Sequence, residues 1–447
     1  MRKRNGTAFR VRLSTDRYDS INAKNVTVLG LGRSGQATVK FLAARGVRVF
    51  ASDQGALRAE LKAELLSLGV ILEENGHSER ALHQADLIVV SPGIESAAAI
   101  MKVAREREIP ILGELELAYQ FCPSEKIIAI TGTNGKTTTT RVMGELLNAQ
   151  GHEVVVAGNI GTPVIEHLEK IHAKTVVVLE VSSFQLETIV TFKPHISLFL
   201  NFAPNHLDRY RNLVDYFDAK CRIFENQTEK DFAVVSRQLP LLPTSKPTML
   251  CYEKVLPQLR TLTLSEHNRL NLAAALTASR VIDPQISPKK LDLQRAFAIP
   301  HRIQFVGEVH KVRFYDDSKA TNVAATLAAL ETFDAPLIPI LGGHDKGCDY
   351  SPLAQAIVKK DVKHVLLIGE ASEKIARALQ HVGYHQPLSV VRDLREAVAC
   401  ATHHPGSVCL LSPACSSFDM FKNYEERGEV FRQAVLEISR RVPARST

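Results

Sequence analysis

The chain has 447 residues, of which 45% are hydrophobic and 23% are charged, and its net charge is +7 at pH 7. This length exceeds what one hydrophobic core usually supports, so we expect two to four domains. No apolar stretch approaches the roughly 18–20 residues of a membrane helix, and the basic residues 1–4 are not followed by the apolar core of a secretory signal. The seven cysteines form no C-x-x-C pair, which is typical of free thiols in a reducing compartment. These features predict a cytoplasmic protein with no membrane partner.

Six basic residues fall within the first 17 positions, so much of the excess positive charge lies in a short N-terminal arm, residues 1–19. A nucleic-acid-binding protein usually carries its basic charge on the folded part, with interleaved aromatic side chains. We therefore expect no nucleic-acid partner. A flexible, solvated tail accounts for the arm better than a binding segment does.

The first expected domain spans residues 20–115. A strand over residues 25–30 runs into the glycine-rich sequence GLGRSG at residues 30–35, and a second strand ends at Asp53. Glycines at this spacing, with an acid about 20 residues further on, are typical of a dinucleotide-binding fold. The pattern alone does not distinguish NAD from another nucleotide diphosphate, and the glycines could also serve only a tight turn. We expect a nucleotide-diphosphate ligand here.

The second expected domain, residues 116–300, contains the sequence IIAITGTNGKTTTTR at residues 127–141. A strand, a glycine-rich turn and the start of a helix make a phosphate cradle, because glycine leaves the backbone N–H groups accessible and a helix N-terminus favours an anion. Lys136 is expected to reach the β- and γ-phosphates, and the Thr137 hydroxyl is expected to bind Mg²⁺. The usual P-loop spacing has glycine where this chain has Ile130. The loop predicts that the protein uses ATP or GTP.

Further strands over residues 153–157, 175–179 and 195–200 alternate with helical segments, which predicts a mostly parallel sheet. Polar residues follow these strands, and the carboxyl ends of parallel strands form the ligand edge of such a sheet. Glu180 is a natural Mg²⁺ ligand at this edge. His206, in the sequence NHLDRY, could be a second metal ligand, although a loop histidine is more often a hydrogen-bonding residue.

Residues 215–226 have the periodicity of a helix, and Lys220 falls in the middle of its apolar face. A buried lysine costs stability unless it is paired or becomes neutral, and burial lowers its pKa. A neutral amine can take up CO₂ to form a carbamate, an anion that can bind metal. The alternative, in which the amine reaches the surface along its flexible stem, fits the helix equally well.

A helix over residues 266–278 has Asn268 and Asn271 near its start, where capping and ligand contact are equally compatible with the sequence. The third expected domain, residues 301–447, repeats the pattern of strands followed by polar clusters, which predicts a second doubly wound sheet. The basic residues of this domain suit an acidic co-substrate or the ATP phosphates, with a structural salt bridge as the alternative. They are Arg302, Lys319 and Lys346.

Six motifs occur in a fixed order: GTNGKTT, EVSSFQLE, NHLDRY, HRI, DDSKATN and SPACSSFDMFKNYEERG. In this combination the chain resembles the Mur ligases, the ATP-dependent amide-forming enzymes of peptidoglycan precursor synthesis, from about residue 21 to the C-terminus. The last two motifs are most similar to those of the members that add D-glutamate to UDP-N-acetylmuramoyl-L-alanine. The resemblance implies a monomeric α/β protein of three domains: an N-terminal Rossmann-like domain, a central domain of the P-loop ATPase type and a C-terminal Rossmann-like domain.

The resemblance also implies a mechanism and roles for individual positions. ATP phosphorylates the substrate carboxylate, and the amine of D-glutamate attacks the acyl phosphate. Thr137 and Glu180 would hold one Mg²⁺ ion, and His206 with a carbamylated Lys220 would hold a second, with Mn²⁺ able to substitute. The implied catalytic residues are Lys136, Glu180, His206, Lys220 and Lys319. The implied ATP contacts are Gly132, Thr133, Asn134, Gly135, Lys136, Thr137, Thr138, Asn268, Arg302 and Asp317. The implied substrate contacts are Ser34, Asp53, Ser91 and Gly93 at the UDP end, Asn159 at the muramoyl or ATP side, and Thr321, Lys346, Ser417, Phe418 and Tyr424 around D-glutamate.

The chain departs from the family pattern after Asp53, where Gln54 and Gly55 replace a hydroxyl residue and an arginine. Two other classes remain as alternatives. A nicotinamide oxidoreductase would use the first glycine-rich loop but leaves the second unexplained, and a nucleotide-binding regulatory protein would need no amino-acid site. Within the family, the alternative is a sister ligase that adds L-alanine or a dibasic amino acid, or that adds glutamate to folate.

Overall fold

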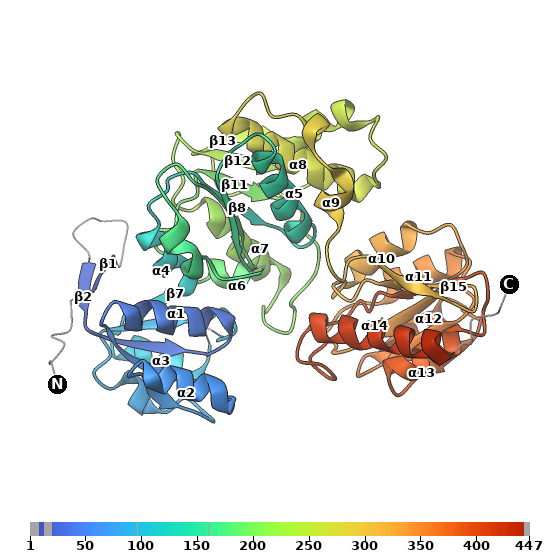
Figure 1. The fold of residues 1–447 in the computed structure, drawn as a ribbon, viewed down its shortest axis with the longest axis horizontal. Helices are drawn as coiled ribbons and strands as arrows, with labels where there is room; N and C mark the ends of the chain where they lie inside the picture. Colours follow the sequence, from blue (N-terminus) through green and yellow to red (C-terminus); the bar gives the residue numbers. More distant parts are fainter. Residues whose placement is uncertain (1–8, 13–19, 96, 160, 442–447) are drawn as a thin grey trace. The chain divides into compact units, whose positions relative to one another are not determined.

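The computed structural model describes residues 9–12, 20–95, 97–159 and 161–441. The chain divides into two compact units: Met1–Phe202 with Val214–Leu291, and Ala203–Leu213 with Asp292–Thr447. The first unit contains two large sheets and the second contains one (Figure 1). The predicted α/β fold with three domains is confirmed, whereas the boundaries at residues 115/116 and 300/301 stay predictions.

The N-terminal sheet has five parallel strands in the order β5-β4-β3-β6-β7. Their bounds are β3 Asn25–Leu29, β4 Arg48–Ser52, β5 Ile71–Glu73, β6 Leu87–Val90 and β7 Ile111–Gly113, with helices α1 Arg33–Ala44, α2 Ala59–Ser67 and α3 Ala99–Glu106 and the 3₁₀ helix η1 Glu79–Leu82. The strand order reverses between β3 and β6. A doubly wound sheet binds its ligand outside the carboxyl ends of the strands at this switch point, so the GLGRSG turn that follows β3 lies where a ligand is expected.

The central sheet has six parallel strands in the order β13-β12-β11-β8-β10-β9. The strands are β8 Ile127–Thr131, β9 Val154–Gly158, β10 Val176–Glu180, β11 Ile196–Phe199, β12 Phe232–Val235 and β13 Thr248–Cys251. The helices are α4 Glu114–Phe121, α5 Lys136–Asn148, α6 Ser183–Leu186, α7 Leu213–Cys221 and α8 Glu266–Ile282, with the 3₁₀ helices η2 Val164–Lys170, η3 Arg222–Phe224, η4 Tyr252–Leu259 and η5 Pro288–Lys290. Because β8 pairs with β10 and β11, the phosphate loop leaves the middle of the sheet.

The C-terminal sheet has the order β14-β15-β19-β16-β17-β18, and every pair is parallel except the antiparallel edge pair β14 and β15. The strands are β14 Gln304–Val309, β15 Val312–Asp316, β16 Leu337–Gly342, β17 Val365–Ile368, β18 Leu388–Val390 and β19 Val408–Leu411. The helices are α9 Leu293–Phe297, α10 Val323–Glu331, α11 Ser351–Lys359, α12 Ser372–His381, α13 Leu394–Ala401 and α14 Tyr424–Arg441. The polar clusters after β15, β16 and β19 therefore meet at one edge.

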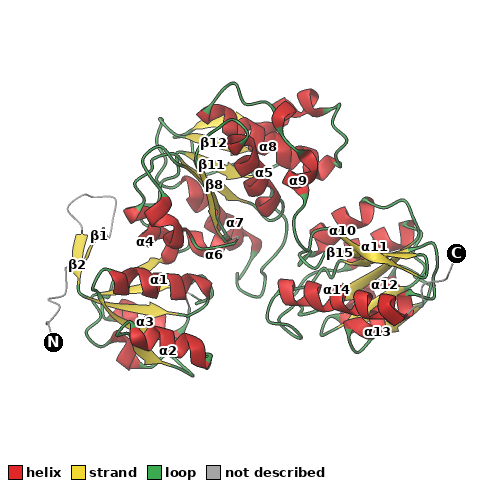
Figure 2. Ribbon diagram, in the orientation of Figure 1, coloured by secondary structure: helices red, strands yellow, loops and turns green. Residues whose placement is uncertain are grey.

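Helices cover both faces of this sheet (Figure 2). Strand β16 shows the consequence, because its side chains alternate between two cores. Leu337 and Leu341 pack with residues of α10, α11 and α12, whereas Ile338 and Ile340 pack with residues of α13 and α14. A strand buried on both faces reads as a continuous apolar run, which is why the interior strands were predictable from the sequence.

Four residues of the predicted arm are described: Phe9–Arg12 form strand β1, which pairs antiparallel with β2, Ser20–Ala23. The Arg12 backbone N–H donates to the side chain of Gln120 at 2.8 Å. The rest of the predicted arm, residues 1–8 and 13–19, lies outside the described residues. In the part of the chain that the structure describes, no helix has the length and apolar character needed to cross a membrane.

Candidate active site

The phosphate loop between β8 and α5 depends on two glycines. Gly132 and Gly135 have φ angles of +147° and +82°, which favour glycine. A Cβ atom on Gly135 would lie 2.3 Å from Oδ1 of Asn271, and one on Gly132 would lie 3.1 Å from Cβ of Leu200. The backbone of the loop therefore favours glycine at both positions, and the loop packs too closely against Asn271 for a larger residue at position 135.

The middle of the loop is held by Asn201, which follows β11. The Thr133 N–H donates to the Asn201 backbone oxygen at 3.0 Å, and the Asn134 N–H donates to Oδ1 of Asn201 at 2.9 Å. The Lys136 ammonium folds back over the loop, where Nζ donates to the carbonyl oxygens of Gly132 and Thr133 at 2.8 and 2.9 Å. The predicted phosphate lysine thus lies over the loop, bonded to neutral carbonyls that a phosphate could replace.

Three predicted residues meet at the Glu180 carboxylate, which ends β10. The Thr137 hydroxyl donates to Oε2 at 2.7 Å, and Nδ2 of Asn159 donates to Oε1 at 2.9 Å. Glu180 is only 3% exposed. A hydroxyl, a carboxylate and an amide are the kinds of group that surround Mg²⁺, so this donor set fits the ion. Within the described ranges, no group of three or more His, Cys, Asp or Glu side chains could hold a metal, so amide, hydroxyl and water oxygens would have to complete such a site.

The structure decides between the two interpretations of Lys220, because the side chain is buried and only 1% exposed. Its Nζ donates to the Gly132 carbonyl at 3.0 Å and lies 4.6 Å from the centre of the Tyr216 ring. Burial holds the pKa of this amine well below the ordinary lysine value, the positive charge of Lys136 lowers it further, and Glu180 opposes the shift. The neutral amine that a carbamate requires is therefore favoured here.

The two asparagines near the start of α8 have different surroundings. Ser265 caps this helix, and its hydroxyl accepts from the Asn268 N–H at 3.3 Å. Capping is therefore done by Ser265 and not by an asparagine side chain. Asn271 is 4% exposed, and its Oδ1 accepts from the Thr139 hydroxyl at 3.4 Å. Its Nδ2 is buried without a hydrogen-bond partner among the described residues. Asn271, which the sequence offered for either capping or ligand contact, is therefore a functional candidate beside the phosphate loop.

A cavity of about 430 Å³ lies at the carboxyl ends of β3 and β6. All four residues predicted for the UDP end line it, and so does Asn159. These four are Ser34, Asp53, Ser91 and Gly93. The Asp53 carboxylate accepts from the N–H groups of Leu31 and Gly55, so it braces the turn that shapes the cavity.

Arg33, for which the sequence predicted no role, also lines this cavity. Arg33 is the first residue of α1 and the only lysine or arginine among the described residues that line the cavity. None of the described residues forms an ion pair or side-chain hydrogen bond with it. An unpaired guanidinium beside a helix N-terminus suits a diphosphate. Two features of the sequence could have indicated this role for Arg33. It lies within GLGRSG, and the arginine expected after Asp53 is absent.

In the second unit, Asp316 and Asp317 are fully buried at the end of β15. Burial raises the pKa of Asp317 to about 6, while the Arg302 guanidinium, 3.6 Å away, and the Ser412 hydroxyl oppose this rise. The His301 imidazole contacts Asp316 at 2.7 Å. The structure therefore brings together Arg302 and Asp317, the two residues of this unit predicted to contact ATP.

The residues predicted around D-glutamate differ widely in exposure. The Lys319 ammonium donates to the Tyr424 hydroxyl at 2.6 Å, and Lys346 is 8% exposed, with a pKa that burial lowers and the nearby Asp208 charge partly restores. Ser417 is 2% exposed, whereas Phe418 is 71% exposed. Half-exposed Thr321 donates its N–H to the Lys319 carbonyl at 3.0 Å. Lys319, Thr321 and Tyr424 thus form one group.

Arg427 is a buried residue of α14 that lies in the last of the six motifs and for which the sequence predicted no role. Its guanidinium, 1% exposed, bonds the Ser318 hydroxyl and the Cys415 and Ser416 carbonyl oxygens at 3.0–3.1 Å. It joins the loops that carry Lys319 and Ser417. A charge in a motif does not reveal the contact with Ser318, because Ser318 lies 109 positions before Arg427 in the chain.

His206 lies in Ala203–Leu213, a segment that groups with the second unit. Its backbone has a φ of +57°, and its carbonyl oxygen accepts from the N–H groups of Arg209 and Tyr210. Lys220, its predicted partner at the second Mg²⁺ ion, belongs to the first unit. A metal site formed by His206 and Lys220 stays a prediction.

Three family models match the chain: "MurD-like, N-terminal domain" at residues 24–113, "Mur ligase middle domain" at 130–249 and "glutamate ligase domain" at 301–415. The protein from Geotalea uraniireducens named UDP-N-acetylmuramoylalanine–D-glutamate ligase is 40% identical over 92% of this chain and 97% of its own length. The equally named protein from Caldicellulosiruptor bescii is 38% identical over 94% and 98%. This chain belongs to the Mur ligase family.

Solved structures agree with this membership at the level of fold. The Mur ligase resembles the UDP-N-acetylmuramate–alanine ligase MurC of Thermotoga maritima, with a TM-score of 0.57 and 18% identity over 92% of this chain and 99% of the other. It also resembles MurF of Acinetobacter baumannii, with a TM-score of 0.55 and 16% identity over 94% of both chains. Members of the family use ATP to form amide bonds, so the protein is an ATP-dependent ligase. The oxidoreductase and the regulatory-protein alternatives are thereby excluded.

Proposed function

We propose that this Mur ligase joins the amine of D-glutamate to the terminal carboxylate of UDP-N-acetylmuramoyl-L-alanine, with ATP converted to ADP and phosphate. The observation that carries the choice of amino acid is the similarity over nearly the full length to relatives named D-glutamate ligases. The observation that carries the ATP chemistry is the meeting of Thr137, Asn159 and Glu180 beside the phosphate loop. No observation favours a sister ligase over this assignment.

The phosphate loop and Lys136 would hold the β- and γ-phosphates, where negative charge develops during transfer. The substrate carboxylate oxygen forms a bond to the γ-phosphorus, and the bond from this phosphorus to the bridging oxygen of ADP breaks. Thr137 and Glu180 would hold Mg²⁺, which when bound neutralises phosphate charge. Its donor set is a hydroxyl and a carboxylate, in keeping with magnesium chemistry.

The amine of D-glutamate then attacks the carbonyl carbon of the acyl phosphate. The tetrahedral intermediate loses a proton and releases phosphate, which leaves the amide. Lys319, Thr321, Lys346, Ser417 and Tyr424 supply cations and hydroxyl groups suited to the two carboxylates of D-glutamate. The cavity that contains Arg33, Ser34, Asp53 and Ser91 would take the uridine diphosphate end.

Lys220 has a further role in this proposal. Its neutral amine would add to CO₂, lose a proton and become a carbamate, and this anion with His206 would hold a second Mg²⁺ ion. The buried position beside Gly132 supports the neutral amine, and the carbamate anion would be attracted to the Lys136 ammonium.

The test is phosphate release from ATP and Mg²⁺ with UDP-N-acetylmuramoyl-L-alanine and, in separate reactions, D-glutamate, L-glutamate, L-alanine or a dibasic amino acid. We expect release that D-glutamate alone stimulates and that EDTA abolishes. Stimulation by another amino acid instead would keep the ligase chemistry and overturn the assignment of D-glutamate. Release without any amino acid would contradict amide formation.

A further inference from the structure

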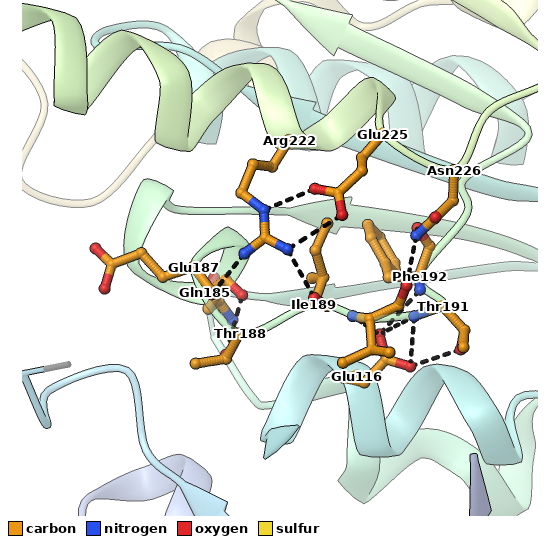
Figure 3. Close-up of polar contacts among 11 residues, drawn as sticks. Glu116, Gln185, Glu187, Thr188, Ile189, Thr191, Phe192, Arg222, Glu225 and Asn226 are labelled. Atoms are coloured by element: carbon orange, nitrogen blue, oxygen red, sulfur yellow. Dashed lines mark hydrogen bonds and ion pairs between the residues drawn. The ribbon is translucent and has the colours of Figure 1, made fainter. Parts of the chain in front are cut away.

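Residues 187–192, which follow α6, form an irregular stretch of backbone, and one carboxylate binds the N–H groups of its last three residues (Figure 3). Glu116 of α4 is 0% exposed and accepts from the N–H groups of Val190, Thr191 and Phe192 at 2.8–3.0 Å and from the Thr191 hydroxyl at 2.6 Å. Buried backbone groups need partners, and this side chain supplies them where no strand or helix does.

The carbonyl oxygens of the same stretch are bound from the other side by Arg222. Its NH1 and NH2 groups donate to the carbonyl oxygens of Glu187 and Ile189 at 2.5 and 2.9 Å. Glu225 orients the guanidinium, with Nε to Oε2 at 2.7 Å. A planar guanidinium can reach two carbonyls and a carboxylate at once, which a lysine ammonium on a single flexible stem does not reproduce.

Asn226, in the turn after η3, adds a second connection. Its Nδ2 donates to the carbonyl oxygens of Val190 and Phe192 at 2.9 and 3.1 Å. Figure 3 shows Arg222, at the start of η3, and Asn226, just beyond its end, pointing toward the same stretch of backbone. The stretch is therefore held between α4 on one side and the end of α7 with η3 on the other.

These contacts connect two elements of the candidate active site. Arg222 follows Lys220 by two residues, at the junction of α7 and η3. Residues 187–192 continue from α6, which begins three residues after Glu180 with a capping box between Ser182 and Gln185. The Arg222 guanidinium thus fixes the helix that carries Lys220 against the segment that leaves Glu180.

We propose that Arg222 is a positioning residue for Lys220, because it sets the place of α7 along the segment after Glu180 and so holds the Lys220 amine at the carbonyl of Gly132. The proposal rests on the proposed function of Lys220. A displacement of about 1 Å in a group near reacting atoms can reduce a rate by about a hundredfold, so a loosened α7 reduces turnover without a lost substrate contact.

The position of Arg222 also makes the test practicable. The side chain is 31% exposed, and with Glu225 it lines a surface cavity of about 440 Å³. A shorter side chain there opens onto water and leaves no closed void in the core. We therefore expect the variant Arg222→Lys, which keeps the charge but loses the planar guanidinium, to fold.

Arg280→Lys is the matched control. Arg280 is also half-buried at the end of a helix, and it also bonds a backbone carbonyl, with Nε to the Ile286 oxygen at 3.1 Å and NH1 to Oε1 of Gln258 at 2.9 Å. Neither partner belongs to the candidate active site. The control therefore measures how the same substitution affects activity and stability at a site whose contacts are only structural.

The experiment compares wild type, Arg222→Lys and Arg280→Lys in three measurements. They are kcat and KM for each substrate, the thermal midpoint, and a ¹³C resonance that appears with labelled bicarbonate and is absent in Lys220→Ala. For Arg222→Lys we expect kcat to fall at least about tenfold with KM values within about twofold, since the substrate contacts are intact. We also expect the ¹³C signal to require more bicarbonate. For Arg280→Lys we expect the kcat and the ¹³C signal of the wild type. Its thermal midpoint should change by about as much as that of Arg222→Lys.

Unchanged kcat and signal in Arg222→Lys would overturn the proposal, as would equal losses in both arginine variants. Failure of the proposed function can be told apart from failure of the proposal for Arg222. If the wild type shows the ¹³C signal but no turnover with D-glutamate, the proposed function is wrong, and the bicarbonate dependence of the signal decides whether Arg222 positions Lys220. If the wild type turns over without a ¹³C signal, Lys220 is not carbamylated, and the kcat values of the two arginine variants decide whether Arg222 positions Lys220.

Discussion

Lys136 and Lys220 donate hydrogen bonds to the same acceptor, the carbonyl oxygen of Gly132, at 2.8 and 3.0 Å. Two ammonium groups on one oxygen would repel each other in a buried place. Lys136 remains at the phosphate loop, whereas Lys220 is buried and has a pKa well below that of an ordinary lysine, first through burial and then through Lys136. The proposed roles of the two lysines, a phosphate-binding cation and a neutral amine, agree with this arrangement.

Replacement of Lys220 by alanine is expected to lower kcat by at least about a hundredfold, because the group proposed to become a carbamate is removed. High bicarbonate or a short-chain carboxylate should restore part of the activity by supplying the missing anion. Steady-state kinetics with and without the additive, on a variant whose circular dichroism matches wild type, measure both effects. A folded variant that no carboxylate rescues would make Lys220 a structural lysine.

The stability of the protein should also depend on the titration of Lys220. The folded-state pKa is lowered from 10.5, so between the lowered pKa and about 10 the unfolded chain binds a proton that the folded chain does not. Stability from this group therefore rises as the pH rises through that window, by at most about 1.4 kcal/mol per pH unit. The difference in unfolding free energy between wild type and Lys220→Met, measured with urea from pH 7 to 10 without bicarbonate, should grow in favour of wild type. A constant difference would mean that Lys220 is charged in the folded state.

Alanine at position 135 should weaken nucleotide binding by more than backbone strain alone would. A Cβ there would lie 2.3 Å from Oδ1 of Asn271, whereas one on Gly151 would meet nothing within 4 Å at a similar φ, +86° against +82°. Both variants lose roughly 1 kcal/mol to the left-handed conformation, but only Gly135→Ala displaces the loop. We expect ADP affinity, measured by calorimetry, to fall at least about tenfold in Gly135→Ala and to stay near wild type in Gly151→Ala. Equal affinities would contradict the close packing of the loop.

Arg33 is expected to serve the diphosphate of the substrate. The change Arg33→Gln should raise KM for UDP-N-acetylmuramoyl-L-alanine about tenfold and leave kcat nearly unchanged, because a charge-assisted bond to a non-reacting group is lost. Arg48→Gln is the control. Exposed Arg48 is the first residue of β4, so it lies at the amino ends of the strands, away from the carboxyl ends where the cavity lies. The salt dependence of KM should weaken only in Arg33→Gln. A KM that both variants leave unchanged would remove Arg33 from the site.

Arg302 should control the ionisation of Asp317. Burial raises the pKa of Asp317 to about 6, and Arg302 opposes this rise, so Arg302→Gln should raise the pKa further. The folded chain binds the extra proton between pH 3.8 and about 6, and stability from this group therefore falls as the pH rises through that window. In Arg302→Gln the fall should continue to higher pH, as measured by urea unfolding from pH 4 to 8. Exposed Arg313 of β15 provides the control Arg313→Gln, which should keep the wild-type profile.

The sequence predicted most interior strands to within two residues, because strands buried on both faces are continuous apolar runs between polar turns. It missed the short edge strands β5 and β18 and the antiparallel β14, whose residues are half-exposed and carry no such signal. The helix predicted over residues 215–226 is present, but it ends as the 3₁₀ helix η3. At and just beyond this end, Arg222 and Asn226 bond to residues 187–192, contacts that the local sequence does not record.

By itself, the sequence determined the phosphate loop, the ligand edges of the sheets and the family, since glycine spacing, strand ends and ordered motifs are local properties of the chain. Only the tertiary structure decided that Lys220 points inward, that Thr137 and Asn159 meet at Glu180, and that Arg33 faces the same cavity as Asp53. Each of these relations joins residues brought together by the order of strands in a sheet or by packing between layers. That order is set by the burial of whole elements, and no local pattern of residues records it.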